Sequence, residues 1–137
     1  MNQTPSTSMK PVYLYSAIPT AAFASVALDT LDFDHGYATF VVAAAIGAGA
    51  AVTGLKVTEC ATSGGSYTAV TGATFTNVST SNDGAAEIAS VRIAPRLRFL
   101  KVEGIGGGAN NSVITAIGVL TGASTSTSCD ATFIAEV

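Results

Sequence analysis

Apolar and polar side chains alternate along most of this chain with the two-residue period of a β-strand. In the stretch VTGLKVTEC, Leu55 and Val57 fall on one face, while Lys56, Thr58 and Cys60 fall on the other. The stretch EIASVRIA separates in the same way into two sets, which are Ile88, Ser90 and Arg92 against Ala89, Val91 and Ile93. No stretch carries a convincing helical pattern, so the chain is predicted to be an all-β protein.

The residues from Tyr37 to Leu55 contain no charged side chain, and the length of this run would suit a membrane span. Its centre, AAAIGAGAA, contributes little transfer energy, and each glycine weakens a helix by about 1 kcal/mol relative to alanine. The run also begins with aromatic and β-branched residues, which favour strands. We therefore expect a strand from Tyr37, a turn at GAGAA and a second strand that continues to Cys60. A membrane-inserted coat protein is the alternative.

Turn signals rich in glycine, proline, serine and asparagine divide the chain into about eight or nine short strands. This count predicts a β-sandwich that we expect to be jelly-roll-like, although it also fits an immunoglobulin-like topology or a barrel. Residues 12–122 would form the sandwich, flanked by an extended N-terminal arm at 1–11 and a C-terminal arm or edge strand at 123–137. The apolar positions in RLRFLKVEG change phase, which predicts a bulge near Phe99 and Leu100.

Charge is scarce, since 11% of the residues are charged, 48% are hydrophobic and the formal net charge is −3. An acidic balance argues against a nucleic-acid partner, because nucleic-acid binders need a basic excess. Four of the six basic residues nevertheless gather in one segment: Arg92, Arg96, Arg98 and Lys101. These four are either a solvated strand face or a contact with the acidic surface of a partner, and they are the candidate partner-binding residues.

Side chains that could carry out chemistry are few. His35 is the single histidine, and Asp34 beside it would point the other way on an extended chain. The segment GIGGGA is spaced like a dinucleotide-binding loop, but strand-forming residues follow it where that motif needs a helix. Cys60 and Cys129 lack the spacing of a zinc site and could form either a disulfide or two reduced thiols. We expect no catalytic residue, metal site or cofactor, and we do not expect an enzyme.

Several stretches form a recognisable series. An aspartate-bearing strand, LDTLDFDHG, precedes a YATFVV strand, and a KVTE strand leads into a short aromatic hairpin. An RFLKV strand and a last apolar strand close the series. The residues at these places are Asp29, Tyr37, Phe40, Lys56, Glu59, Tyr67, Arg98 and Val102. The series, which covers about residues 25–122, resembles the small capsid decoration (cement) proteins of tailed bacteriophages.

This resemblance implies a β-sandwich or jelly roll on the exterior of a virion capsid assembled in the host cytoplasm. There the protein would decorate and stabilise the shell by bridging neighbouring major capsid subunits. The major capsid protein would be its partner, and the chain would form a homo-oligomer, either a dimer or a trimer, without binding nucleic acid or membrane. The alternative is a β-sandwich receptor- or carbohydrate-recognition module of a phage tail or fibre, which would need an exposed aromatic platform.

Overall fold

The computed structural model describes residues 9–33, 36–80 and 86–122. These residues form ten strands and no helix, which confirms the all-β prediction. The strands are β1 (Met9–Ala17), β2 (Ala22–Ala24), β3 (Leu28–Asp29), β4 (Tyr37–Ala45), β5 (Ala51–Cys60), β6 (Thr68–Thr74), β7 (Val78–Ser79), β8 (Glu87–Arg92), β9 (Phe99–Gly106) and β10 (Val113–Thr121). Within these residues, therefore, no helix of membrane-spanning length and hydropathy is found.

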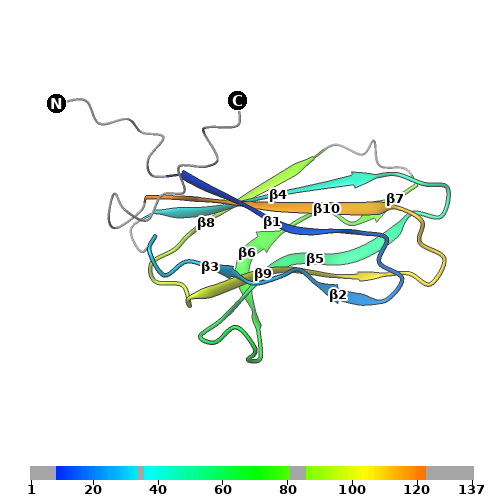
Figure 1. Ribbon diagram of the computed structural model, residues 1–137. Helices are drawn as coiled ribbons and strands as arrows, with labels where there is room; N and C mark the ends of the chain where they lie inside the picture. The colour runs from blue at the N-terminus through cyan, green and yellow to red at the C-terminus, as the bar shows by residue number, and fades with distance from the viewer. Residues whose placement is uncertain (1–8, 34–35, 81–85, 123–137) are drawn as a thin grey trace.

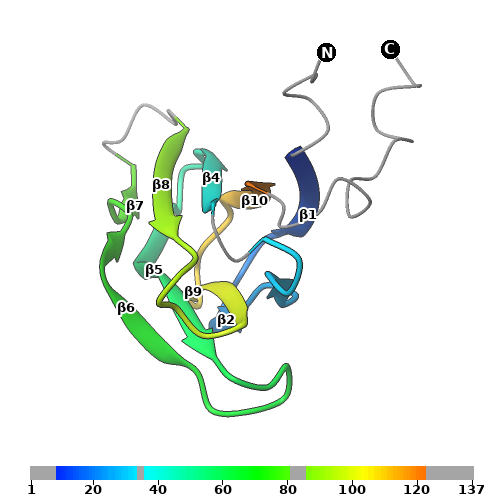
Figure 2. The same cartoon turned by 90° about the vertical axis from the view of Figure 1, so that its left-hand side faces the viewer.

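The strands form two antiparallel sheets that pack face to face as a β-sandwich (Figure 1). The first sheet has the order β1-β10-β4-β8 and forms the upper layer of the figure. The second has the order β2-β9-β5-β6, with β3 added beside β9 and β7 beside β5. Seen from the end, β6 and β8 run along the same side of the sandwich (Figure 2), where each is the edge of its own sheet.

The strand order is that of a jelly roll, the kind of sandwich that we expect, and it is not the immunoglobulin-like order that the strand count also fits. Four nested antiparallel pairs, β1 with β10, β2 with β9, β4 with β8 and β5 with β6, describe one long hairpin. Rolling this hairpin up adds the pairs of β10 with β4 and of β9 with β5. Of the connections between these eight strands, the one from β5 to β6 stays within a sheet, and the others cross between the layers. This connectivity closes both sheets around one core.

The uncharged run from Tyr37 folds as the sequence predicts, with β4 in one sheet, a turn at residues 46–50 and β5 in the other. Asparagine side chains of the β9–β10 connection hold this turn and the start of β5. Asn110 and Asn111 accept hydrogen bonds from the backbone N–H groups of Ala51 and Gly49, at 3.2 and 2.9 Å. The buried Asn110 amide also donates to the carbonyl of Pro19 at 2.8 Å, so one asparagine links three crossings between the sheets.

The core is built largely from alternate residues of the long strands β4, β9 and β10, as expected where one face of a strand is buried. Phe40 and Leu120 of the first sheet are fully buried, and so are Val57 and Leu100 of the second. The largest buried apolar side chains come from both layers and from the loop before β4: Phe33, Phe40, Leu14, Leu28, Leu100, Ile114, Leu120, Val52, Val57 and Val102. Burial of these residues in one continuous cluster stabilises the pairing of the two sheets.

The bulge predicted near Phe99 and Leu100 is wrong. Strand β9 begins at Phe99 and alternates regularly from there, while Leu97 lies in the preceding loop, so there is no change of phase within the strand. The irregularity lies in β5, where the register with β9 shifts between Thr53 and Lys56. Gly54 occupies this bulge with φ of +63°, a conformation that other residues adopt only with strain.

The sheets extend slightly further towards the N-terminus than expected. Strand β1 begins at Met9 and pairs with the end of β10, so residues 9–11 belong to the first sheet. The remainder of the expected N-terminal arm, residues 1–8, and the expected C-terminal arm or edge strand, residues 123–137, lie outside the described residues.

Candidate functional site

The predicted partner-binding residues surround the loop of residues 93–98, which leads from the end of β8 to the start of β9. Its first residue, Ile93, is buried, and its N–H donates to the carbonyl of Gly36 at 3.0 Å. The loop therefore starts from a fixed point beside β4 and crosses one end of the sandwich. It continues through the cis Ala94–Pro95 peptide to the two arginines.

Arg96 is held by a carboxylate from β5. Its Nη1 lies 3.3 Å from Oε1 of Glu59, and the other oxygen of Glu59 accepts the backbone N–H of Leu97 at 2.9 Å. The two side chains are 31% and 15% exposed, so the pair is partly shielded from water. Glu59 thus fixes both the arginine and the backbone of the loop.

Arg98 is held by a second carboxylate, from β3. Its Nε and Nη2 donate to the two oxygens of Asp29 at 2.8 and 2.7 Å, a fork that fixes the plane of the guanidinium. The guanidinium carbon lies 4.8 Å from the centre of the Phe99 ring. The hydrogen bonds from Arg98 hold the pKa of the Asp29 carboxyl below its usual value, and the N–H of Leu31 adds to this effect.

The other two predicted residues point to opposite sides of the sandwich. Arg92 is the last residue of β8, pairs with Tyr37 and is exposed on the outer side of the first sheet. Lys101 lies on the outer side of the second sheet, with its Nζ 4.1 Å from the centre of the Tyr67 ring. The structure therefore does not bring the four residues into one basic patch. It brings two of them, Arg96 and Arg98, together at the loop of residues 93–98.

A shallow apolar hollow accompanies these two arginines. It has a volume of about 290 Å³ and lies between the β3–β4 connection and the loop of residues 93–98. Its lining residues are Thr30, Leu31, Ile93, Ala94, Pro95, Arg96 and Arg98. Leu31 and the nearby Leu97 are 58% and 42% exposed, although both are large apolar side chains. We call residues 29–31 and 93–98 the docking end.

Thr30 links the two loops of the docking end by hydrogen bonds and so fixes their relative position. Its backbone N–H and its hydroxyl both donate to the carbonyl of Arg98, at 3.0 and 2.7 Å. Thr30 is itself buried. A preformed apolar hollow with fixed arginines at its rim is the arrangement found at the centres of protein–protein interfaces.

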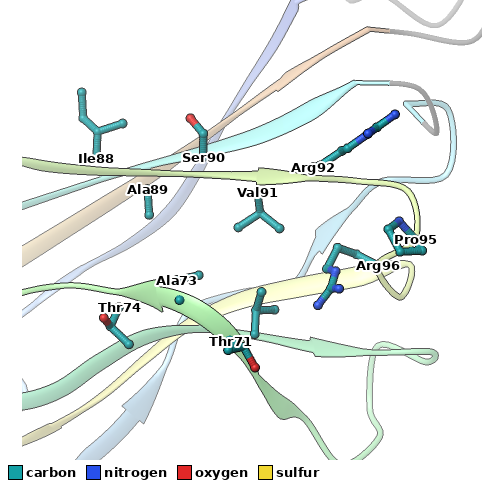
Figure 3. A pocket seen from close by; sticks show the side chains of 12 residues that line it. Thr71, Ala73, Thr74, Ile88, Ala89, Ser90, Val91, Arg92, Pro95 and Arg96 are labelled. Carbon is teal, nitrogen blue, oxygen red and sulfur yellow. The ribbon is translucent and has the colours of Figure 1, made fainter.

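A second groove lies where the edges of the two sheets meet (Figure 3). It has a volume of about 480 Å³ and runs between β6 and β8, with Pro95 and Arg96 at one end. Ala89 and Val91 point from β8 towards β6, while Ile88 and Ser90 point the other way (Figure 3). Among the described residues no further strand pairs with the outer edges of β6 and β8, so the groove is suited to an added strand.

The part of the chain that the structure describes brings together few side chains that could form a catalytic or metal site. Those residues hold no group of three or more histidine, cysteine, aspartate or glutamate side chains placed to bind a metal ion. Cys60 is a buried free thiol, and Cys129, Asp34 and His35 lie outside the described residues. The glycines of GIGGGA belong to β9 and to a turn before β10, so the helix of a dinucleotide-binding motif does not follow them.

The sequence analysis did not predict the two carboxylates that hold the arginines of the docking end. Asp29 and Glu59 precede their arginine partners by 69 and 37 positions along the chain, so no local pattern joins them. The resemblance marked both carboxylates, but gave neither a partner. Leu31 gave a weak signal, since it is an isolated large apolar residue between Thr30 and Asp32 in a polar turn.

Comparison with known proteins adds no further information about the docking end. No protein-family model, curated protein or solved structure matches this chain.

Proposed function

We propose that this chain is a structural virion protein that decorates the assembled capsid of a tailed bacteriophage. It stabilises the shell by bridging neighbouring major capsid subunits on the exterior of the virion. Binding only to the assembled state adds the free energy of binding to that state, so the shell resists disassembly. The proposal rests on the resemblance of the strand series to the capsid decoration proteins. It agrees with a jelly roll whose apolar hollow and groove lie on its surface.

Among the structural observations, the docking end supports the proposal most directly. Leu31 and Leu97 expose apolar surface beside Arg96 and Arg98, whose positions are already fixed by carboxylates of the same chain. Because the two arginine side chains are ordered before binding, little of their conformational entropy is lost when a partner covers them. In this proposal the two leucines enter the apolar surface of the major capsid protein, and the arginines contact polar groups at the rim.

Bridging requires more than one attachment for each decoration unit. We propose that the chain acts as a homo-oligomer, either a dimer or a trimer, so that each unit carries several docking ends. Two or more weak contacts held in one unit bind far more tightly than a single contact, provided that their spacing matches the spacing of the capsid subunits.

The proposal is tested with purified protein and capsids of the phage that encodes it. Leu97→Asp should lower the number of copies that sediment with the capsids, because it places a carboxylate in the apolar contact. Ile105→Asp is the matched control, since Ile105 is 55% exposed on β9 outside the docking end. If wild-type protein does not sediment with capsids, the proposed function is wrong. If both variants bind like wild type, the docking end is wrongly assigned.

The second candidate function is a receptor- or carbohydrate-recognition module, and two exposed tyrosines favour it. Tyr13 and Tyr37 are 63% and 50% exposed on the outer side of the first sheet. Strand spacing and rise per residue place them about 16 Å apart, because they lie two strands and four residues from each other. Two separated rings offer two stacking contacts rather than one platform. Titration with oligosaccharides, read by calorimetry, would reveal binding that Tyr13→Ala and Tyr37→Ala abolish.

A further inference from the structure

The outer face of the first sheet is unusually apolar for a surface. Across its four strands, Tyr13, Ile117, Val41 and Ile88 form one continuous row in which each residue is paired with the next. Tyr13, Ile117 and Ile88 are 63%, 37% and 68% exposed. We call the outward side chains of β1, β10, β4 and β8 the apolar face.

The rows on either side of this one carry no charged side chain, and most of their side chains are small. The row on one side holds Pro11, Val119, Thr39 and Ser90, and the row on the other side holds Ser16, Thr115 and Ala43. Among the described residues that point outward from these four strands, Arg92 is the one with a charge, and it lies at the corner where β8 ends. An antiparallel sheet in contact with water normally alternates apolar residues inside with polar residues outside, and this sheet departs from that rule.

The outer side of the second sheet provides an internal comparison. There, Lys56 of β5 is paired with Glu103 of β9, and Lys101 lies one position along the same side. That side carries opposite charges in adjacent positions, as a solvent-exposed sheet usually does. The two outer sides of one small domain therefore differ in chemistry, because the second carries opposite charges beside the buried Thr58 and Cys60, whereas the first exposes large apolar side chains.

The charge of the apolar face fits a second copy of the same face. Its large side chains stand on both edge strands and on β10 at the centre, as Tyr13, Ile88 and Ile117, so the apolar contact would extend across the width of the sheet. A two-fold axis along the strand direction places β1 of one copy over β8 of the other, so Tyr13 meets the second copy's Ile88. The same operation places Arg92 over Met9 rather than over another arginine, so no like charges are opposed.

The area of the apolar face is sufficient for a specific but modest interface. Strand spacing and rise per residue give the four strands a footprint of roughly 500 Å². Two such faces would together bury about 1,000 Å² or more, which is the lower limit for a specific protein–protein interface. We propose that two copies of this chain pack face to face through their apolar faces to form a two-fold symmetric dimer.

This inference deepens the homo-oligomer of the proposed function, because it names the surface and selects the dimer. It does not depend on capsid binding, since the dimer would exist in the isolated protein. The apolar face and the docking end share no residue, so a dimer keeps both of its docking ends free. A dimer with two free docking ends is the simplest unit that can bridge two capsid subunits.

Analytical ultracentrifugation of the full chain tests the proposal. Wild-type protein should sediment at twice the 13.6 kDa chain mass at concentrations of about 100 µM and above, where a modest dimer is formed by mass action. Ile88→Asp should weaken the dimer at least roughly tenfold, because it buries a carboxylate in the apolar contact. Ile105→Asp, which adds the same charge to the outer side of the second sheet, should leave the dimer unchanged.

Three results would overturn the dimer. A wild-type monomer, a trimer, or an Ile88→Asp variant that dimerises as well as Ile105→Asp would each contradict it. Hydroxyl-radical labelling of Tyr13 then identifies the true occupant. Protection of Tyr13 in a monomer would assign the apolar face to another segment of the same chain. Protection that appears only on capsids would assign the face to the shell. Capsid binding by a wild-type monomer would leave decoration of the capsid standing, but it would remove the dimer and with it bridging through two docking ends.

Discussion

Glu59 offers the sharpest test of how the docking end is held. Its carboxylate, 15% exposed, accepts the backbone N–H of Leu97 at 2.9 Å and contacts Nη1 of Arg96 at 3.3 Å. A hydrogen bond to a charged group contributes about 1.5–3 kcal/mol, and a partly exposed ion pair about 0–1 kcal/mol. Glu59→Ala removes both, so we expect the free energy of unfolding to fall by about 2 kcal/mol. Glu59→Gln keeps an acceptor for the N–H and should lose about 1 kcal/mol.

Urea denaturation followed by circular dichroism measures these changes. With a denaturant slope of about 1–3 kcal/mol/M for a small protein, Glu59→Ala should lower the midpoint by roughly 1 M. Glu103→Ala removes the same charge from the outer side of β9 and should change the stability by less than about 0.5 kcal/mol. If the two alanine variants were equally stable, the carboxylate of Glu59 would not hold the loop, and the account of the docking end would fail.

Two further predictions concern the other fixed points of the fold. The pKa of Asp29 is lowered in the folded state, so its pair with Arg98 stabilises the protein above the unfolded-state pKa of about 3.9 and this contribution is lost as the pH falls through the folded value. Urea midpoints of wild type and Asp29→Asn should therefore differ at pH 7 and converge near pH 2, and a constant difference would refute the linkage. A Cβ at Gly106 would collide with the carbonyl oxygen of Pro19, whereas a Cβ at Gly108 would meet nothing within 4 Å. Gly106→Ala should therefore cost more than about 2 kcal/mol in thermal unfolding and Gly108→Ala less than about 0.5 kcal/mol, and similar melting temperatures would contradict the close packing of β9.

The layers of the fold could be predicted because they depend on local patterns. The run from Tyr37 to Leu55 folds back on itself because its glycines disfavour a helix and its flanking residues favour strands. The jelly-roll order was also expected, but strand count alone could not separate it from other sandwiches. Pairs such as β1 with β10 join residues about as far apart as this domain allows, and no local pattern encodes them.

Alternation divided β8 correctly into two sets but could not say which set faces the core. One set holds Ile88 and the other holds Val91, so both contain a residue suited to burial. The structure buries Val91 and exposes Ile88, because β4 presents Phe40 and Val42 inward and leaves Val41 beside Ile88. The apolar face was therefore invisible until the strands were placed side by side. The period of two separates faces, and only the packing assigns them.

The basic segment shows the same limit for the candidate site. Its four residues lie within ten positions of one another, yet Arg92 and Lys101 are exposed on opposite sides of the sandwich. Alternation within a strand, and a loop that crosses between sheets, send neighbouring residues in different directions. The two arginines that do come together are paired with carboxylates, so the site is an apolar hollow with a fixed polar rim rather than a free basic patch.

We propose that this jelly roll acts by binding a capsid surface through its docking end. If it does, cryo-electron microscopy of the virions that carry the chain should show density for the sandwich on the outside of the shell. The loop of residues 93–98 and Leu31 should then lie against the major capsid protein. A shell without this density, or with the sandwich attached through the β9–β10 end while residues 93–98 face solvent, would contradict it.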